Sequence, residues 1–177
     1  MKLLIGLGNP GQKYENTRHN LGFIFLDKLR EKWSLSEFRL ENKFAAEISQ
    51  GEFSSEKIIL AKPQNFMNLS GEAVKKIMTF YKINIEDLLI IHDDIDILLG
   101  KYKLATDSTS AGHNGVQNII DQLSTKKFAR LRIGIKTENE NQIETSDFVL
   151  GKLLPEEMEK IVAIEKNILE EIEKMVF

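Results

Sequence analysis

KLLIGLGNPG, residues 2–11, predicts a short buried strand that ends in a tight turn. After the leading lysine its residues are apolar or glycine as far as Gly8, which is typical of a strand covered on both faces of a sheet. Gly8-Asn9-Pro10-Gly11 then forms a turn cluster. Strand and helix patterns alternate along the chain that follows, so this strand is the first element of a predicted α/β fold.

Apolar residues at helical spacing predict a helix over residues 20–33 and a second helix that starts near Asn68. A third helix is expected to open at residues 113–115, and a fourth at Pro155, since proline suits the first turn of a helix. Five further strands are predicted at residues 44–49, 57–61, 87–91, 101–104 and 131–135, with the first two joined around Gly51. Strands interleaved with helices predict a single three-layer α/β domain with a mixed sheet over residues 1–177.

Length and composition fit one ordinary globular domain: 177 residues, of which 42% are hydrophobic and 29% charged. The chain has no cysteine, so disulfides and thiolate metal sites are excluded. The N-terminus MKLLIGLGNPG begins like a signal peptide but turns polar after about seven residues, too few for a signal sequence. No later stretch approaches a membrane span. We therefore expect a cytoplasmic protein without a membrane partner.

The net charge of −3 disfavours a strongly basic nucleic-acid groove, but the charge is unevenly distributed. Residues 1–135 hold 19 Lys and Arg against 16 Asp and Glu, whereas residues 136–177 hold 5 against 11. The acidic excess therefore lies in the last segment, and a local basic patch elsewhere is compatible with the composition.

The glycines Gly6, Gly8 and Gly11 fit the G-x-G-x-x-G dinucleotide pattern in letters. That pattern works when the third glycine opens a helix whose N-terminus holds a pyrophosphate, with an acidic residue about 20 positions further on. Here the helix is expected some nine residues later, and the acidic residue is missing. A plain turn is the favoured interpretation, and it leaves Asn9 at the carboxyl end of a strand, where ligands commonly bind.

Two further segments carry candidate chemistry. His19, in TRHN at residues 17–20, stands beside a helix start, where a lone histidine is more often a capping or surface residue than a catalyst. HDDID, residues 92–96, has three interpretations, which spacing ranks in this order: a solvated turn, a carboxylate that orients a distant histidine, and a hard-cation site.

Asn68 and Asn114 also stand at apparent helix starts, where capping is their default role. Phe66 and Met67 are core residues by default. The collection of His, Asp and Asn lacks a nucleophile, since there is no cysteine and no serine in a G-x-S-x-G elbow. A histidine paired with a carboxylate then indicates activated water, and neutral amides suit carbonyl and amide groups better than phosphates.

The same residues resemble those of bacterial peptidyl-tRNA hydrolases. The resemblance runs from Met1 to about Lys152 and rests on six segments in the family's order and spacing: GLGNPGQKYENTRHNLG, KPQNFMNLSGEAV, IIHDDIDILLG, AGHNG, RLRIGI and FVLGK. It implies a monomeric α/β/α globule with a twisted mixed β-sheet. It also implies hydrolysis of the ester that joins a peptide's carboxyl group to the terminal ribose of tRNA, so that peptidyl-tRNA is the expected partner.

The resemblance also implies residue roles. His19 would be the general base and Asp93 its orienting partner, with no metal and no cofactor. The other implied contacts are Asn9, Asn68 and Asn114 to the peptide backbone and the attacking water, Tyr14 and Met67 in the walls of the cleft, and Lys103 and Arg132 to tRNA phosphates. Neutral imidazole can take a proton from water near neutral pH, so the implied chemistry is coherent.

Among the departures of the sequence from the family pattern, two lie near the AGHNG segment. The usually glycine-rich loop before Gly112 reads ATDSTSA, residues 105–111, and is about two residues longer, and Gln117 stands where relatives usually carry Lys or Arg. Two other functions stay open: an RNA-binding relative that has lost catalysis, and a nucleotide-dependent oxidoreductase. The intact His19, Asp93 and asparagines favour the esterase over the former, and only the glycine pattern supports the latter.

Overall fold

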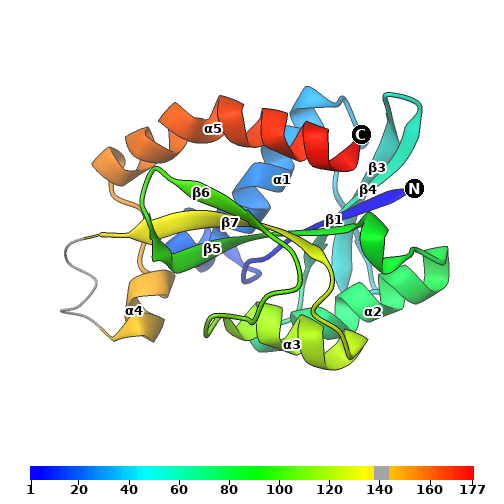
Figure 1. Ribbon diagram of the computed structural model, residues 1–177, viewed down its shortest axis with the longest axis horizontal. Helices are drawn as coiled ribbons and strands as arrows, with labels where there is room; N and C mark the ends of the chain where they lie inside the picture. Colours follow the sequence, from blue (N-terminus) through cyan, green and yellow to red (C-terminus); the bar gives the residue numbers. More distant parts are fainter. Residues whose placement is uncertain (138–143) are drawn as a thin grey trace.

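Within residues 1–137 and 144–177, which the computed structural model describes, seven strands form one mixed sheet in the order β2-β3-β4-β1-β5-β7-β6 (Figure 1). The strands are β1 (Lys2–Gly6), β2 (Arg39–Glu41), β3 (Ala46–Phe53), β4 (Glu56–Pro63), β5 (Leu88–Leu98), β6 (Tyr102–Ala105) and β7 (Ala129–Lys136). The central strand β1 is parallel to β4 and β5, and β5 is parallel to β7. The outer pairings β2–β3, β3–β4 and β6–β7 are antiparallel.

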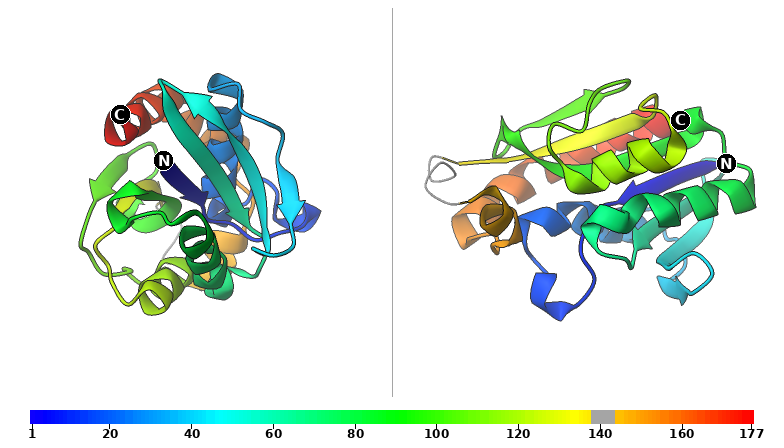
Figure 2. Two further views of the ribbon diagram at one scale, coloured as in Figure 1. Left: turned by 90° about the vertical axis from the view of Figure 1, so that its right-hand side faces the viewer. Right: turned by 90° about the horizontal axis from the view of Figure 1, so that it is seen from below.

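Helices cover both faces of this twisted sheet and complete the predicted three layers (Figures 1 and 2). On one face lie α1 (Leu21–Lys32) and α5 (Pro155–Val176), and on the other α2 (Ser70–Tyr81) and α3 (Asn114–Leu123). The short helix α4 (Thr145–Leu150) contacts η2. The 3-10 turns are η1 (Gln12–Tyr14), η2 (Arg18–Asn20), η3 (Met67–Leu69) and η4 (Ile85–Asp87).

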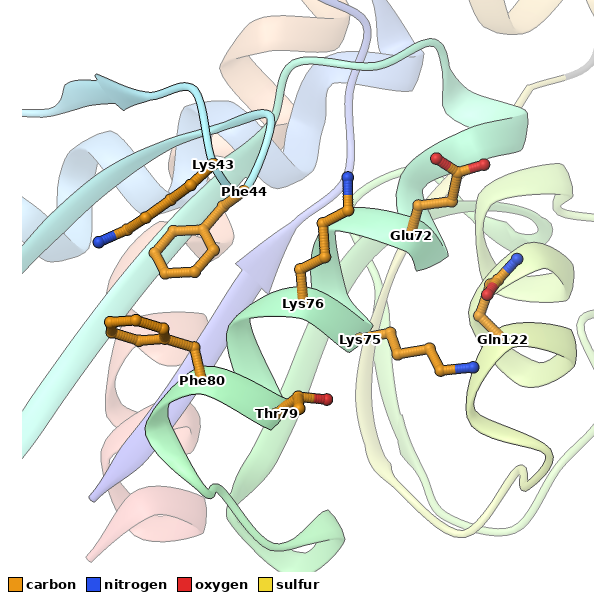
Figure 3. Close-up of a pocket in the computed structure, with 8 residues that line it drawn as sticks. All are labelled: Lys43, Phe44, Glu72, Lys75, Lys76, Thr79, Phe80 and Gln122. Carbon is orange, nitrogen blue, oxygen red and sulfur yellow. The ribbon is translucent and has the colours of Figure 1, made fainter.

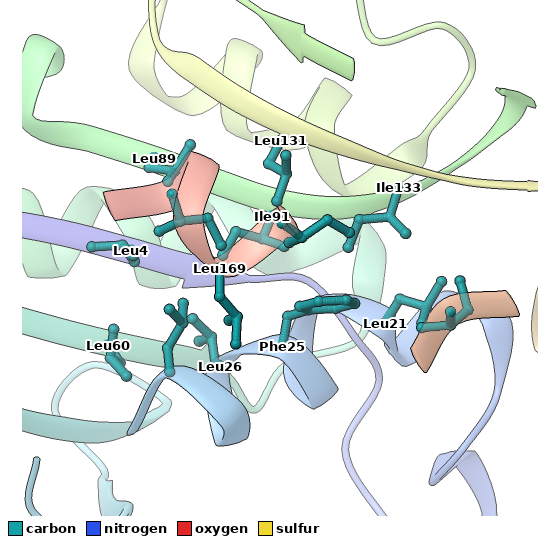
Figure 4. Packing of buried hydrophobic residues seen from close by; sticks show 14 of the residues in the cluster. Leu4, Leu21, Phe25, Leu26, Leu60, Leu89, Ile91, Leu131, Ile133 and Leu169 are labelled. Carbon is teal, nitrogen blue, oxygen red and sulfur yellow. The ribbon is translucent and has the colours of Figure 1, made fainter. Parts of the chain in front are cut away.

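The alternation of β1 divides the core into two clusters. Leu4 points to the α1–α5 side, in a cluster that includes Phe25 and Leu169, as Figure 4 shows. Leu3 and Ile5 point to the α2–α3 side. All three strand residues are fully buried, which confirms the sequence interpretation of this stretch. Burying each such side chain contributes roughly 1.5–3 kcal/mol, so β1 anchors both layers.

One glycine sets where the first helix begins. A Cβ atom on Gly22 would collide with the backbone of Leu7 and of Ile91, so only glycine allows α1 to start against the end of β1 and the first half of β5. This close approach places the preceding turn η2, and with it His19, over β5 beside Asp93.

Two predicted boundaries were wrong. The β3–β4 hairpin does not turn at Gly51, which lies inside β3 opposite Ile58. It turns at Ser54 and Ser55, which both adopt positive φ (50° and 65°), as tight hairpin turns require. The second error concerns residues 92–96. They are not a turn but the continuation of β5, because β7 runs beside them and supplies hydrogen-bonding partners as far as Asp94 before a register shift.

Candidate active site

A cavity of about 420 Å³ opens where β5, η2, α4 and the start of α3 meet. It lies where the regular parallel pairing of β5 with β7 ends at Asp94, and ligands of α/β proteins commonly bind at the carboxyl side of parallel strands. Its lining combines three buried ionisable side chains with small, polar and apolar residues: His19, Asp93, Asp94, Ile95, Ala111, Gly112, His113, Asn114, Thr145, Ser146 and Val149. Of the residues predicted from the sequence, His19, Asp93 and Asn114 therefore share one cavity.

His19 and Asp93 are in direct contact although 74 positions separate them. Nδ1 of His19 lies 2.9 Å from Oδ1 and 3.0 Å from Oδ2 of Asp93. Both side chains are buried, with total exposures of 8% and 2%. Since the carboxylate accepts from Nδ1, the proton of a neutral His19 is held on Nδ1, and Nε2 is left as the basic nitrogen.

This contact displaces the ionisation of both residues. Burial lowers the pKa of His19, but the charge and the hydrogen bond of Asp93 outweigh it and leave the pKa above its ordinary value. Burial raises the pKa of Asp93, yet the neighbouring His19 and His113 overcome this and hold it well below its usual range. Asp93 therefore stays ionised at neutral pH.

A second histidine contacts the same carboxylate. Nε2 of His113 lies 3.1 Å from Oδ1 of Asp93, and its ring centroid is 4.8 Å from that of His19. His113 was expected only as part of a helix start and was not predicted as a site residue. The available signal was that the chain has just three histidines, one of which adjoins Asn114.

His92, the third histidine, completes the group from within the sheet. Its Nδ1 donates to the backbone carbonyl of Asp93 at 2.6 Å, and its ring meets that of His113 edge to face at 4.8 Å. Burial, followed by the proximity of His113, holds the pKa of His92 well below its ordinary value. His92 is therefore a neutral, buried support under Asp93.

Asn9 is placed by two neighbours. Its backbone N–H donates to Oδ1 of Asn20 at 2.9 Å, and its carbonyl accepts from Nδ2 of Asn20 at 3.0 Å. Its side-chain Oδ1 accepts from the backbone N–H of Met67 at 2.9 Å. Asn9 thus holds the Met67 turn against the end of β1, and it lines a neighbouring polar hollow of about 390 Å³.

The capping interpretation of Asn68 and Asn114 was wrong. Asn68 lies inside η3, and neither η3 nor α2 has a side-chain cap. The residue that caps α3 is His113, whose side chain accepts from two backbone N–H groups, while Asn114 is the first residue of that helix. Both asparagines are exposed. Tyr14 ends η1 and is half-buried, with Nζ of Lys13 4.7 Å from its ring centroid.

Lys103 and Arg132 lie directly opposite each other on β6 and β7. Lys103 is exposed, whereas Arg132 is partly buried and donates from Nε to Oδ2 of Asp94 at 2.6 Å. Because Asp94 also lines the cavity, this ion pair connects the predicted phosphate contact to the site. The two cationic side chains are adjacent, as expected, but the ion pair with Asp94 neutralises much of the charge of Arg132.

The two departures from the family pattern contact each other. Oγ of Ser110, in the longer loop, donates to Oε1 of Gln117 at 2.7 Å. The buried Arg130 holds the same loop by hydrogen bonds to the carbonyl of Thr109, at 2.9 Å, and to Ser108. The loop is therefore tied to α3 and β7 where it approaches the cavity.

His19, Asp93 and His113 are also the group among the described residues whose ligand atoms could converge on a metal ion, lying within 4.8 Å of one another. Two imidazoles and a carboxylate are a common zinc set. Here, however, both imidazoles direct a nitrogen at the same oxygen of Asp93 at hydrogen-bond distance. The arrangement fits a carboxylate that accepts two N–H groups. The glycine pattern offers no dinucleotide site, since Gly11 leads into the short turn η1 and not into an α-helix.

A larger hollow of about 700 Å³ lies over α2, between the loop before β3 and α3, as Figure 3 shows. Lysines and aromatic rings line it: Lys43, Phe44, Glu72, Lys75, Lys76, Thr79, Phe80 and Gln122. None of the predicted site residues reaches it. Its size alone does not make it the reaction site, because the buried ionisable groups surround the smaller cavity.

A three-layer α/β domain in which a buried carboxylate orients an imidazole at the wall of a cavity is typical of an enzyme. The model of the family described as peptidyl-tRNA hydrolase matches residues 3–177. The chain belongs to the peptidyl-tRNA hydrolase family. It is 45% identical over 167 residues to the peptidyl-tRNA hydrolase of Bacillus cytotoxicus, covering 94% of this chain and 88% of that protein. The Brevibacillus brevis enzyme is 44% identical over 151 residues, 85% of this chain and 78% of the relative.

Solved structures agree in fold. A crystal structure of peptidyl-tRNA hydrolase from Acinetobacter baumannii superposes with a TM-score of 0.90 at 33% identity, and covers 99% of this chain and 88% of that one. A peptidyl-tRNA hydrolase crystallised with N-propanol superposes with a TM-score of 0.92 at 34% identity and the same coverage. The predicted α/β/α fold and family are thereby confirmed. None of the described helices has the length and apolarity needed to cross a membrane.

Proposed function

We propose that this peptidyl-tRNA hydrolase cleaves the ester between the peptide carboxyl group and the terminal ribose of tRNA with His19 as general base. The observation that carries the proposal is the contact of His19 Nδ1 with both oxygens of the buried Asp93. It leaves Nε2 as the basic nitrogen, at the wall of the cavity.

In the proposed reaction, Nε2 of His19 takes a proton from water as the water oxygen attacks the ester carbonyl. The carbonyl–ribose C–O bond then breaks, and the ribose oxygen takes the proton back from the imidazolium. Asp93 keeps the proton on Nδ1 and stabilises the transient positive charge. No cysteine competes for the role of nucleophile, since the chain has none.

Exposed amides would hold the peptide. Asn114 lines the cavity, and Asn68 lies exposed in η3, next to the Met67 turn that Asn9 supports. Amide side chains pair with the neutral N–H and carbonyl groups of a peptide. An aminoacyl-tRNA offers a charged amine instead, whose desolvation next to amides is costly, so this arrangement favours peptidyl-tRNA.

Phosphates of tRNA would meet the Lys103–Arg132 pair. Nε of Arg132 is engaged by Asp94, but its terminal nitrogens have no hydrogen bond to a described residue and can reach a phosphate. We therefore expect few phosphate contacts and a modest affinity, which suits an enzyme that must release every tRNA. A cytoplasmic monomer remains our expectation, and sedimentation of the free protein would test the second part.

Turnover of N-acetyl-aminoacyl-tRNA tests the proposal. His19→Ala should lower kcat by roughly 10²–10⁴-fold, because general-base assistance is lost, while the melting temperature changes little. Near-normal turnover by a folded His19→Ala protein would exclude His19 as the base. A parent protein that bound the substrate without cleaving it would instead support the RNA-binding alternative.

A further inference from the structure

We infer that His113 is a positioning residue for this reaction: a neutral imidazole that joins the start of α3 to the carboxylate of Asp93. The inference rests on the proposed roles of His19 and Asp93. It starts from the observation that all three histidines of the chain gather around one aspartate, although only His19 is needed as a base.

Both ring nitrogens of His113 are occupied. Nδ1 accepts from the backbone N–H of Gly115 at 3.2 Å and of Val116 at 3.3 Å, which are orphan donors in the first turn of α3. A nitrogen that accepts two N–H groups has no room for a proton of its own. The proton of His113 is therefore on Nε2, which donates to Oδ1 of Asp93. The backbone of α3 fixes this tautomer.

The groups that face His113 come from several elements. The N-terminus of α3 carries partial positive charge, which suits an accepting nitrogen in the capping position. α4 contributes only Thr145, Ser146 and Val149 to the cavity wall. The titratable and charged groups around the cluster are His19 from η2, His92, Asp93 and Asp94 from β5, and Arg130 and Arg132 from β7. Since Asp94 is committed to Arg132, Asp93 is the carboxylate left to the imidazoles.

Asp93 therefore accepts two N–H groups on Oδ1, from His19 at 2.9 Å and from His113 at 3.1 Å. The second donor restricts rotation of the carboxylate and draws off part of its negative charge. It also couples two parts of the site, because the residue that holds Asp93 is followed directly by Asn114 in α3. A displacement of α3 would loosen the carboxylate and move the amide together.

The space beside His113 is equally constrained. A Cβ atom on Gly115 would lie 2.5 Å from Sδ of Met67 and 3.2 Å from the ring of His113. Glycine at this position leaves room for the imidazole over the first turn of α3 while Met67 packs behind it, and a larger residue would require Met67 to move. The local sequence HNG thus supplies the cap, the exposed amide and the space they need.

Two substitutions separate the two contacts of His113. In His113→Asn, the amide oxygen can replace Nδ1 as a cap, and asparagine is a favoured capping residue, but no N–H reaches Asp93. In His113→Gln, the longer amide can place an N–H near the position of Nε2, while the cap is weakened. The readouts are the melting temperature, kcat and the pH dependence of kcat/KM on N-acetyl-aminoacyl-tRNA.

We expect His113→Asn to melt close to the parent yet lose roughly 10- to 100-fold in kcat, the effect of one hydrogen bond to a charged group. The acid limb of kcat/KM should move to higher pH, because His19 then meets the undiminished charge of Asp93. His113→Gln should have a lower melting temperature than the parent but an unchanged acid limb of kcat/KM. If kcat in both variants simply followed the melting temperature, and neither moved the limb, His113 would be only a cap.

The tautomer can be measured without turnover. The 15N imidazole spectrum has to resolve only three histidines. We expect Nδ1 of His113 to stay unprotonated, and Nε2 protonated, across the pH range of the acid limb. A proton on Nδ1 in that range would overturn the inference, whereas normal turnover by His19→Ala would overturn the proposed function and leave this result intact.

Discussion

Glu157→Ala should destabilise the protein strongly, because it leaves a buried guanidinium without its counter-ion. Nη2 of Arg18 donates to both carboxylate oxygens of Glu157, at 2.9 and 2.7 Å, and the two residues are only 8% and 6% exposed. After the substitution Arg18 would retain the carbonyl of Phe148, at 3.1 Å, and the face of its ring, at 4.4 Å. Removing one partner of a buried pair costs about 3–5 kcal/mol.

For a chain of this length each kcal/mol lowers the melting temperature by about 2–4 °C, so the expected loss is roughly 6–20 °C. Glu156→Ala is the matched control: the same residue type in the same first turn of α5, but exposed. It should cost no more than about 1 kcal/mol, the usual value of a charge near a helix terminus. Circular dichroism and urea titration measure both.

The double variant Arg18→Met/Glu157→Met makes the test specific. Replacing both partners of a buried pair with apolar side chains is often neutral, so most of the lost stability should return. Because Arg18 directly precedes His19 in η2, Glu157→Ala should also lower turnover at temperatures where it stays folded. A loss below 1 kcal/mol in Glu157→Ala, or no recovery in the double variant, would refute the argument that this ion pair holds α5 to the site.

Three further outcomes follow from the site. Asp93→Asn should lower kcat by roughly 10- to 10³-fold, less than loss of the base itself. It should also shift the acid limb of kcat/KM to lower pH, because the charge that raises the pKa of His19 is gone. An unmoved acid limb would contradict this assignment of Asp93. Lys103→Ala should raise KM for full-length peptidyl-tRNA and reduce the slope of binding against salt by about 0.7–0.9, while KM for a peptide esterified to a short 3′ fragment changes little. The control Lys57→Ala, at another exposed lysine, should leave KM for both substrates nearly unchanged. Equal losses on both substrates in Lys103→Ala would exclude a phosphate contact. The free energy of unfolding should fall as pH drops below about 6.5, because His92 gains a proton only in the unfolded chain. Urea titrations at about pH 5.5 and 7 measure this difference, and His92→Phe should make it smaller.

Much of the fold could be predicted from local pattern. The apolar stretch of β1 and the helical periodicity of α1 and α2 gave elements of the right type in the right order, because burial on a sheet or a helix face leaves a period in the sequence. The errors came where tertiary partners decide. Gly51 attracted the hairpin turn, yet two serines form it, and the acidic run 92–96 extends β5 only because β7 lies beside it.

The site was less accessible to such reasoning. Strand-end logic placed Asn9 correctly after the carboxyl end of β1, but Asp93 lies inside β5, and spacing left the His19–Asp93 contact as one of several possibilities. Asn68 and Asn114 were expected as caps because asparagine favours that position, whereas the structure uses His113. His113 was harder to single out, since one of its contacts is local and the other spans 20 positions to Asp93.

The net charge of −3 disfavours a nucleic-acid partner, and the positions of the acidic residues in the fold explain why this indication is misleading. The acidic residues of the last segment belong mainly to α5, which covers the same face of the sheet as α1 (Figure 1). Two of them pair with lysines of α1: Glu165 with Lys28 and Glu173 with Lys32, both at 2.8 Å. Lys103 is exposed on the edge strand β6. A weakly acidic protein can therefore bind tRNA, because counter-ion release depends on the charges at the contact and not on their total.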